Sequence, residues 1–200
     1  MANIAAIRSV GISLQRYLQR AYDAYRVDHG AMPACTFSVV SSGDLQGQDD
    51  PAEGGTQVLI FLYRVNIDAH LRNSGRQARP EMRPAPVSVD LHFLITFWTD
   101  SADNEHLVLA WTLRQLHNTP ILDATTLEID GGWAADDIVQ LIPAELSNED
   151  LMRIWDALQP SYRLSLAYIA RVVRIDPDEF AEAGPVVASR FSYAIPQERP

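Results

Sequence analysis

The side chains best suited to catalysis or metal binding in this sequence are its five histidines. His29, His70, His92, His106 and His117 form no pair at the His-x-His or His-x-x-x-His spacing that a metal site uses. His106 and His117 share a helical face, but the rise of a helix would hold them about 16 Å apart, too far to share an ion. The histidines therefore predict no metal site.

Nucleophilic chemistry is equally poorly supported. The sequence contains no Gly-x-Ser-x-Gly elbow, Walker A loop or Gly-x-Gly-x-x-Gly fingerprint, and without lysine no Schiff base can form. Cys35 lies in the apolar run of residues 34–40, which favours a buried structural thiol over a nucleophile. Scattered aspartates, including Asp123, Asp130 and Asp136-Asp137, could serve a glycosidase, but in an acidic chain they are more typical of solvated loops. The sequence predicts no catalytic residue and no cofactor; an enzyme of unknown chemistry stays as an alternative.

Length, composition and net charge exclude or disfavour several other classes of function. The chain has 200 residues, 47% of them hydrophobic, and a formal net charge of −10. This length favours one domain with a substantial core. The negative charge disfavours binding to nucleic acid or to an anionic membrane surface, and no apolar run reaches the roughly 18–20 residues of a membrane span. With a single cysteine and no signal-peptide pattern over residues 4–25, we expect a cytoplasmic protein.

All sixteen basic residues are arginines. A GC-rich gene would explain this, and the alternative is that guanidinium groups bind carboxylates in protein contacts. The polar connection of residues 66–86 is either a solvated loop, a basic surface that meets an acidic patch such as residues 44–53 of a neighbouring subunit, or an anion-binding loop. Its arginines are therefore candidate subunit contacts: Arg72, Arg76, Arg79 and Arg83.

Hydrophobic periodicity predicts the elements that position these side chains. We expect a helix over residues 4–25, strands over 35–40, 58–65 and 87–98, a helix from Asp100 or Ser101 to about His117, short extended pieces at 125–130 and 138–142, a helix from Ser147 to Pro160, and a strand over 162–175. Residues 41–55 are predicted to be a loop. The order indicates an α+β domain over residues 1–176, with a mainly antiparallel sheet and helices on one side, followed by a C-terminal extension over 177–200.

The same patterns predict which faces are buried. The strand over 87–98 alternates strictly, so its odd positions form one apolar face. In the helix that ends near His117, a stripe of Leu109, Leu113 and Leu116 is expected to face the core. The strand over 162–175 carries a continuous apolar face on its even positions, up to Val172. Trp155 and Tyr162 are predicted to be core anchors.

Three blocks, taken in order, resemble one family. They are VLIFLYRVN at 58–66 with LRN at 71–73; LHFLIT at 91–96 with an acidic helix start and TPIL at 119–122; and LSNEDL at 146–151 with Ile154-Trp155 and YRLSLAY at 162–168. Together they are similar to the tail-terminator, or cap, proteins of phage-tail-like contractile injection systems. The resemblance covers residues 4–176 and implies a tail-terminator-like fold with no catalytic residues.

The resemblance also implies a role and partners. It implies a ring, expected to be hexameric, that closes the distal end of the tube, binds the last sheath layer and becomes part of the assembled particle. A tube-like or connector subunit of the same particle is the alternative. The strand-like residues 186–195 could pair with a neighbouring subunit, with the sheath or with the chain's own sheet. Phe191 and Tyr193 join the four arginines as candidate subunit or sheath contacts.

Overall fold

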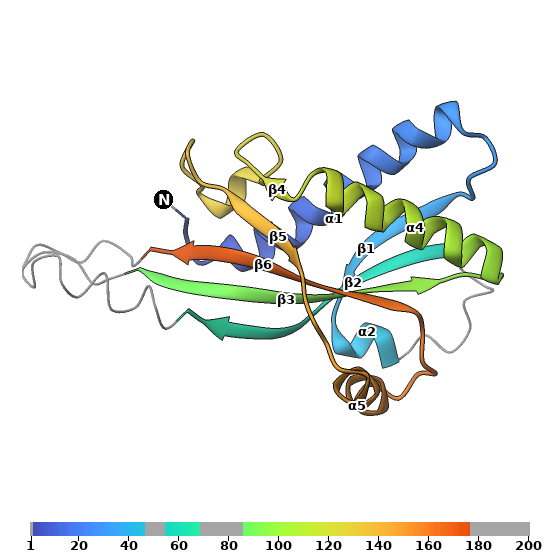
Figure 1. Ribbon diagram of the computed structural model, residues 1–200. Coiled ribbons are helices and arrows are strands. Elements are labelled where there is room, and N and C mark those ends of the chain that lie inside the picture. Colours follow the sequence, from blue (N-terminus) through green and yellow to red (C-terminus); the bar gives the residue numbers. More distant parts are fainter. Residues whose placement is uncertain (1, 47–54, 69–85, 177–200) are drawn as a thin grey trace, which may run out of the picture.

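The computed structural model describes residues 2–46, 55–68 and 86–176, and one sheet runs through this part of the chain (Figure 1). Its elements follow in the order α1 (Ala6–Asp28), β1 (Cys35–Val40), α2 (Ser42–Gln46), β2 (Thr56–Ile67), β3 (Val87–Trp98), α4 (Ala102–Asn118), β4 (Ile121–Leu122), the 3₁₀ turn η2 (Ile129–Gly131), β5 (Val139–Pro143), α5 (Asn148–Leu158) and β6 (Ser165–Ile175).

The sheet has the strand order β1-β2-β3-β6-β5-β4. Strand β1 runs parallel to β2, and every other neighbouring pair is antiparallel. Helices α1 and α4 cover one face, while α2 and α5 cover part of the other (Figure 1). The predicted α+β class and mainly antiparallel sheet are confirmed. The expectation of helices on one side is wrong, because the second face of β3 also carries large apolar side chains that need cover.

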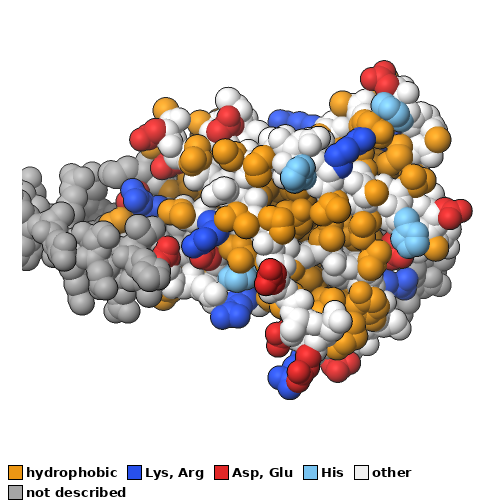
Figure 2. Space-filling model, viewed as in Figure 1, with side chains coloured by type: hydrophobic (Ala, Val, Ile, Leu, Met, Phe, Trp, Pro, Cys, Tyr) orange, Lys and Arg blue, Asp and Glu red, His pale blue; other side chains and the backbone are white. Residues whose placement is uncertain are grey.

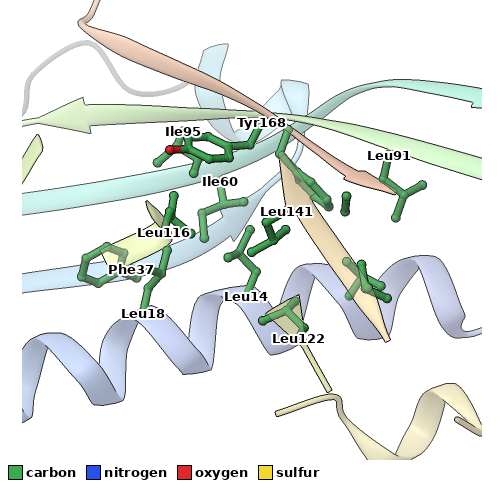
Figure 3. Close-up of a cluster of buried hydrophobic side chains, with 14 of the residues drawn as sticks. Leu14, Leu18, Phe37, Ile60, Leu91, Ile95, Leu116, Leu122, Leu141 and Tyr168 are labelled. Atoms are coloured by element: carbon green, nitrogen blue, oxygen red, sulfur yellow. The ribbon is translucent and has the colours of Figure 1, made fainter. Parts of the chain in front are cut away.

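The larger core lies between the sheet and the layer of α1 and α4 (Figure 3). Helix α1 presents apolar residues mainly at every fourth position, and Leu14 and Leu18 point from it toward the sheet. The odd positions of β3, from Val89 to Phe97, face the same core, as the alternation predicted. Removing these side chains from water supplies most of the driving force for folding.

A smaller core lies on the opposite face, under α2 and α5. Its buried side chains are Leu45, Leu59, Leu94, Trp98, Trp155 and Leu158. Helix α5 begins as predicted, because the Ser147 hydroxyl accepts a hydrogen bond of 3.1 Å from the backbone N–H of Asp150. Gln159 then ends the helix with a φ of 75°. Residues 41–55 are not loop throughout, since α2 forms there to bring Leu45 to this core.

Several local predictions are wrong. Tyr162, expected to be a core anchor at the start of a strand, is 46% exposed and lies before β6, which begins at Ser165. In α4 the buried side chains are Val108, Trp111, Thr112 and Leu116, whereas Leu113 is 44% exposed. Leu116 and Leu109 contact the core as predicted, whereas Trp111, with its ring centred 4.8 Å from that of Tyr22, takes part in the core and Leu113 does not. Residues 125–130 form a turn and η2 instead of a strand, because the Asp123 carboxylate accepts the backbone N–H of Thr125 at 3.0 Å.

A further correction concerns β6, whose alternation breaks at a β-bulge. Val89 pairs with Val173 and Leu91 with Ala170, so two residues of β6 stand opposite Asp90 alone. Val172, in a left-handed conformation at φ 61°, therefore points outward and is 42% exposed, while Val173 is fully buried. Sequence periodicity placed Val172 on the core face because a bulge leaves no mark in an apolar run.

Candidate assembly surface

The residues predicted to make subunit or sheath contacts fall outside the described part of the chain. Arg72, Arg76, Arg79 and Arg83 belong to residues 69–85, and Phe191 and Tyr193 to residues 177–200. The candidate surface is therefore built from the described residues, starting with the two edges of the sheet. An open edge would allow strand addition, whereas a closed edge leaves only side-chain contacts for assembly.

The β1 edge is closed by two glutamines of α1. Gln19 accepts the backbone N–H of Phe37 at 2.8 Å and donates to the carbonyl of Cys35 at 3.2 Å. Gln15 donates to the Phe37 carbonyl at 2.9 Å. Gln19 thereby offers this edge a donor and an acceptor, as a neighbouring strand would. Residues 35–37 are not available to pair with another chain while α1 stays in place.

The opposite edge is shortened by β4 and carries two prolines. Leu141 donates its backbone N–H to the Pro120 carbonyl at 2.7 Å, and Pro120 has no N–H with which to return the bond. Pro143, at the end of β5, also lacks a donor. Short strands and prolines are the usual means by which a sheet edge resists pairing with other chains. Contacts made by the described part are therefore expected to use side-chain faces.

One such face is an apolar groove between α4 and β5, with a volume of about 710 Å³. Figure 2 shows hydrophobic side chains gathered in a band across this side of the molecule. The lining residues are Ala110, Leu113, Arg114, Leu116, His117, Pro120, Gln140, Leu141, Ile142, Pro143 and Tyr168. We call this the α4–β5 groove. Its size and lining suit an apolar segment of another protein.

Charge lies at the rim of the groove rather than on its floor. Burial raises the pKa of the Tyr168 phenol, which stays neutral, and no hydrogen bond joins it to the described residues. At the rim, the Arg114 guanidinium lies 4.9 Å from the centre of the Tyr25 ring, and His117 is exposed in the last turn of α4. The groove thus offers apolar contact with cationic or titratable groups beside it, and no paired acid and base.

The side chains first considered for chemistry have structural roles. Burial raises the pKa of the Cys35 thiol to about 12, so this buried residue is a structural thiol, as predicted. Hydrogen bonds from the hydroxyl and backbone of Thr125 lower the pKa of Asp123, which holds a turn. Asp137 likewise accepts the N–H of Ala134 at 2.7 Å. No cluster of three metal-binding side chains occurs among the described residues.

His92 takes part in a polar chain on the open part of the second face. Arg64 donates from Nε to the Asn66 side-chain oxygen at 2.8 Å, which leaves the Asn66 amide nitrogen to face His92 Nε2 at 3.0 Å. His92 Nε2 must accept this bond, so its imidazole is neutral. Burial lowers the pKa of His92, and the nearby Arg64 lowers it further. His92 is thus a fixed acceptor in a strand, not a proton donor aimed at a cavity.

The α4–β5 groove was not identified from the sequence, because Leu113 was assigned to the core. Two signals could have pointed to it. Apolar residues surround Trp111 on more than one side of α4, and prolines at 120 and 143 flank the short strands that follow. Neither signal places α4 beside β5, since the pairing of β5 with β6 brings them together.

Comparisons with known proteins extend this description. The family described as the Pvc16 N-terminal domain matches residues 9–189. Among solved structures, the sheath/tube terminator of the extracellular contractile injection system PVC, in its extended state, is similar at 22% identity with a TM-score of 0.54, over 98% of this chain and 64% of that chain. The tube-terminating cap of the anti-feeding prophage is similar at 24% identity with a TM-score of 0.45, over 69% of this chain and 50% of that chain.

Three further findings accompany these matches. No curated protein matches the sequence. The chain spans less than two thirds of the length of either similar structure. Among the described helices, none combines the length and apolar character needed to cross a lipid bilayer.

Proposed function

Because the chain belongs to the Pvc16 N-terminal domain family, we propose that it is a structural subunit that caps the distal end of the tube and sheath of a contractile injection system. The match over residues 9–189 is the observation that carries this proposal. The likeness of fold to the PVC sheath/tube terminator, which includes 98% of this chain, supports it.

The proposed cap is a ring of identical copies, with six as the expected number, that contacts the sheath and the inner tube. Closed rings are built from one repeated contact between neighbouring copies. The α4–β5 groove is the proposed contact surface of the described part, because it is apolar and exposed, while residues 35–37 of the β1 edge are covered and the opposite edge is short and carries prolines. Residues 72–83 and 186–195 are proposed as further contacts, the latter in a C-terminal extension, with assembly in the cytoplasm.

The location of the protein in the particle tests this proposal. A tagged full-length chain is produced together with the particle, and electron microscopy of the purified particles locates the tag. The cap role predicts labelling at one end only. Labelling along the shaft or at the baseplate would instead support a tube-like or connector subunit, and its absence from particles would refute both roles.

Two leucines of α4 provide a matched test of the groove. Leu113 lines it and is 44% exposed, whereas Leu107 is 45% exposed on the same helix and lies outside it. Leu113→Asp should remove the protein from particles while leaving the fold intact, since both side chains are half exposed. Leu107→Asp should be incorporated as the wild type is. Equal incorporation of the two variants would exclude the groove as a contact.

A further inference from the structure

An arginine with no carboxylate partner among the described residues lies over the ring of Trp98, the last residue of β3, two residues before β6 begins. We propose that Arg163 is a binding site for a carboxylate of a second copy of this chain, presented by an aromatic cluster of Trp98, Trp155 and Tyr162. The choice of a second copy rests on the proposed ring, whereas the carboxylate chemistry rests on the side chains themselves.

The cluster holds the guanidinium in a defined place. The Arg163 guanidinium carbon lies 5.0 Å from the centre of the Trp98 ring. Trp98 is itself fixed, because its indole N–H donates to the Thr96 hydroxyl at 2.9 Å and its side chain is 1% exposed. The Trp155 ring packs 6.3 Å from Trp98 and meets Tyr162 edge-on at 6.0 Å. An arginine stacked on a rigid ring loses less freedom when it binds a partner.

Two hydrogen-bond donors in this cluster are buried without an acceptor. Arg163 Nε and Trp155 Nε1 have no hydrogen-bond partner among the described residues, although each is enclosed by protein atoms. Leaving a donor unpaired inside a protein is costly, and such groups are few in native structures. The indoles of Trp98 and Trp133, by contrast, donate to the Thr96 and Ser9 hydroxyls. The Trp111 indole in the main core is likewise unpaired among the described residues, so an unpaired donor alone does not indicate an outside partner. Arg163 is the candidate to meet an acceptor from another chain because its side chain is only partly buried.

Arg163 also differs from the arginines that are already paired. Within the described residues, Arg8, Arg16, Arg153 and Arg171 each lie within 4.0 Å of a carboxylate. Among the described residues no carboxylate lies within that distance of Arg163. The same holds for Arg20, Arg26, Arg64, Arg114 and Arg174, but Arg163 differs from these in lying over a buried tryptophan ring. A planar guanidinium matches a carboxylate with two parallel hydrogen bonds, and the adjacent indoles exclude water that would weaken them.

A second copy supplies the required chemistry. The chain carries 26 acidic residues against 16 basic ones, so a neighbouring copy brings a surplus of carboxylates. Tyr162, which is 46% exposed and packs edge-on against Trp155, leaves apolar surface available in this cluster. Trp, Tyr and Arg surrounded by apolar contact are the residues that most often dominate the energy of a protein interface.

Self-association of the full chain tests the proposal through substitutions at one position. Arg163→Lys keeps the charge but loses the planar pair, and Arg163→Gln loses the charge. We expect the dissociation constant for self-association, from sedimentation velocity over a dilution series, to rise by roughly 10-fold or more for the first and 30-fold or more for the second. The control is Arg153→Gln, whose arginine is 72% exposed and paired with Glu149 on the same helix. It should associate as the wild type does.

A spectroscopic readout separates direct contact from loss of fold. In wild-type protein labelled with ¹⁵N, the Arg163 Nε and Trp155 indole resonances should shift as concentration rises, while the bonded Trp133 indole should not. Any of three results would overturn the inference. These are unchanged self-association of both Arg163 variants, a wild-type chain that stays monomeric at every concentration, and resonances that do not move. The cap role is tested separately, by the position of the label in the particle. If particles are labelled at one end but the Arg163 variants self-associate as the wild type does, the Arg163 site is refuted and the cap role is not.

Discussion

Replacing Gly131 with alanine should destabilise the protein because there is no space for a methyl group. A Cβ at this position would lie 2.7 Å from the Ser9 hydroxyl oxygen and closer still to the indole nitrogen of Trp133. These two atoms are joined by a hydrogen bond of 2.9 Å, and Ser9 also donates to the Glu128 carbonyl at 3.0 Å. The backbone of Gly131 lies outside the left-handed region, so the effect is one of contact alone.

The expected magnitude follows from two contributions. Forcing a methyl group into a filled site costs about 1–3 kcal/mol, and separating the Trp133 indole from Ser9 adds about 0.5–1.5 kcal/mol. The free energy of unfolding should therefore fall by roughly 2–4 kcal/mol, which for a chain of this size lowers Tm by about 5–12 °C. Urea unfolding followed by tryptophan fluorescence, together with calorimetry, measures both quantities.

Gly30 provides the matched control. A Cβ added there meets no atom within 4 Å, and this glycine also lies outside the left-handed region. Gly30→Ala should change the free energy of unfolding by less than about 0.5 kcal/mol. If Gly131→Ala were as stable as Gly30→Ala, the packing of η2 against α1 described here would be wrong.

Three other perturbations have defined outcomes. Gln19→Ala should speed hydrogen exchange at the Phe37 amide by roughly 10-fold or more, since that N–H loses its acceptor; unchanged exchange measured by NMR would mean that α1 does not close the edge. His92→Gln should flatten the pH dependence of the free energy of unfolding measured in urea. The pKa of His92 is lower in the folded state than in the unfolded state, so the wild type loses stability as pH falls below about 6.5. If the free energies of wild type and variant fell in parallel with pH, this reasoning would be wrong. Val172→Gly should be neutral or stabilising by up to about 1 kcal/mol because it relieves the φ of 61°, whereas Val173→Gly should cost about 3 kcal/mol; equal losses in calorimetry would contradict the bulge.

The family and the class of function could be predicted from the sequence. The order and spacing of three blocks indicated a tail-terminator protein, and the family match over residues 9–189 confirms that resemblance. The prediction of a structural protein rather than an enzyme agrees with the same match. Ring size and the contacts of Arg72, Arg76, Arg79, Arg83, Phe191 and Tyr193 stay predictions, because those residues lie outside the described part.

Local sequence signals also determined most of the elements. Strict alternation fixed β3 over Val87–Trp98 and both of its faces, because side chains of a strand point to opposite sides in turn. The Ser147 hydroxyl fixed the start of α5, since capping depends on residues three positions apart. Signals of this kind need no knowledge of distant parts of the chain, which is why they could be read directly.

Only the tertiary structure decided which surfaces remain exposed. Periodicity gives a helix an apolar side but cannot say which neighbour covers it, so Leu113 was assigned to the core and lies instead in the α4–β5 groove. Tyr162 was expected to be a core anchor; β6 begins only at Ser165, and Tyr162 is 46% exposed beside the buried Trp155. The cover of residues 35–37 by α1 and the placing of Arg163 over Trp98 likewise depend on side chains brought together from distant parts of the chain. A side chain is buried only when a second surface covers it, and that surface comes from another part of the chain once the whole chain has folded.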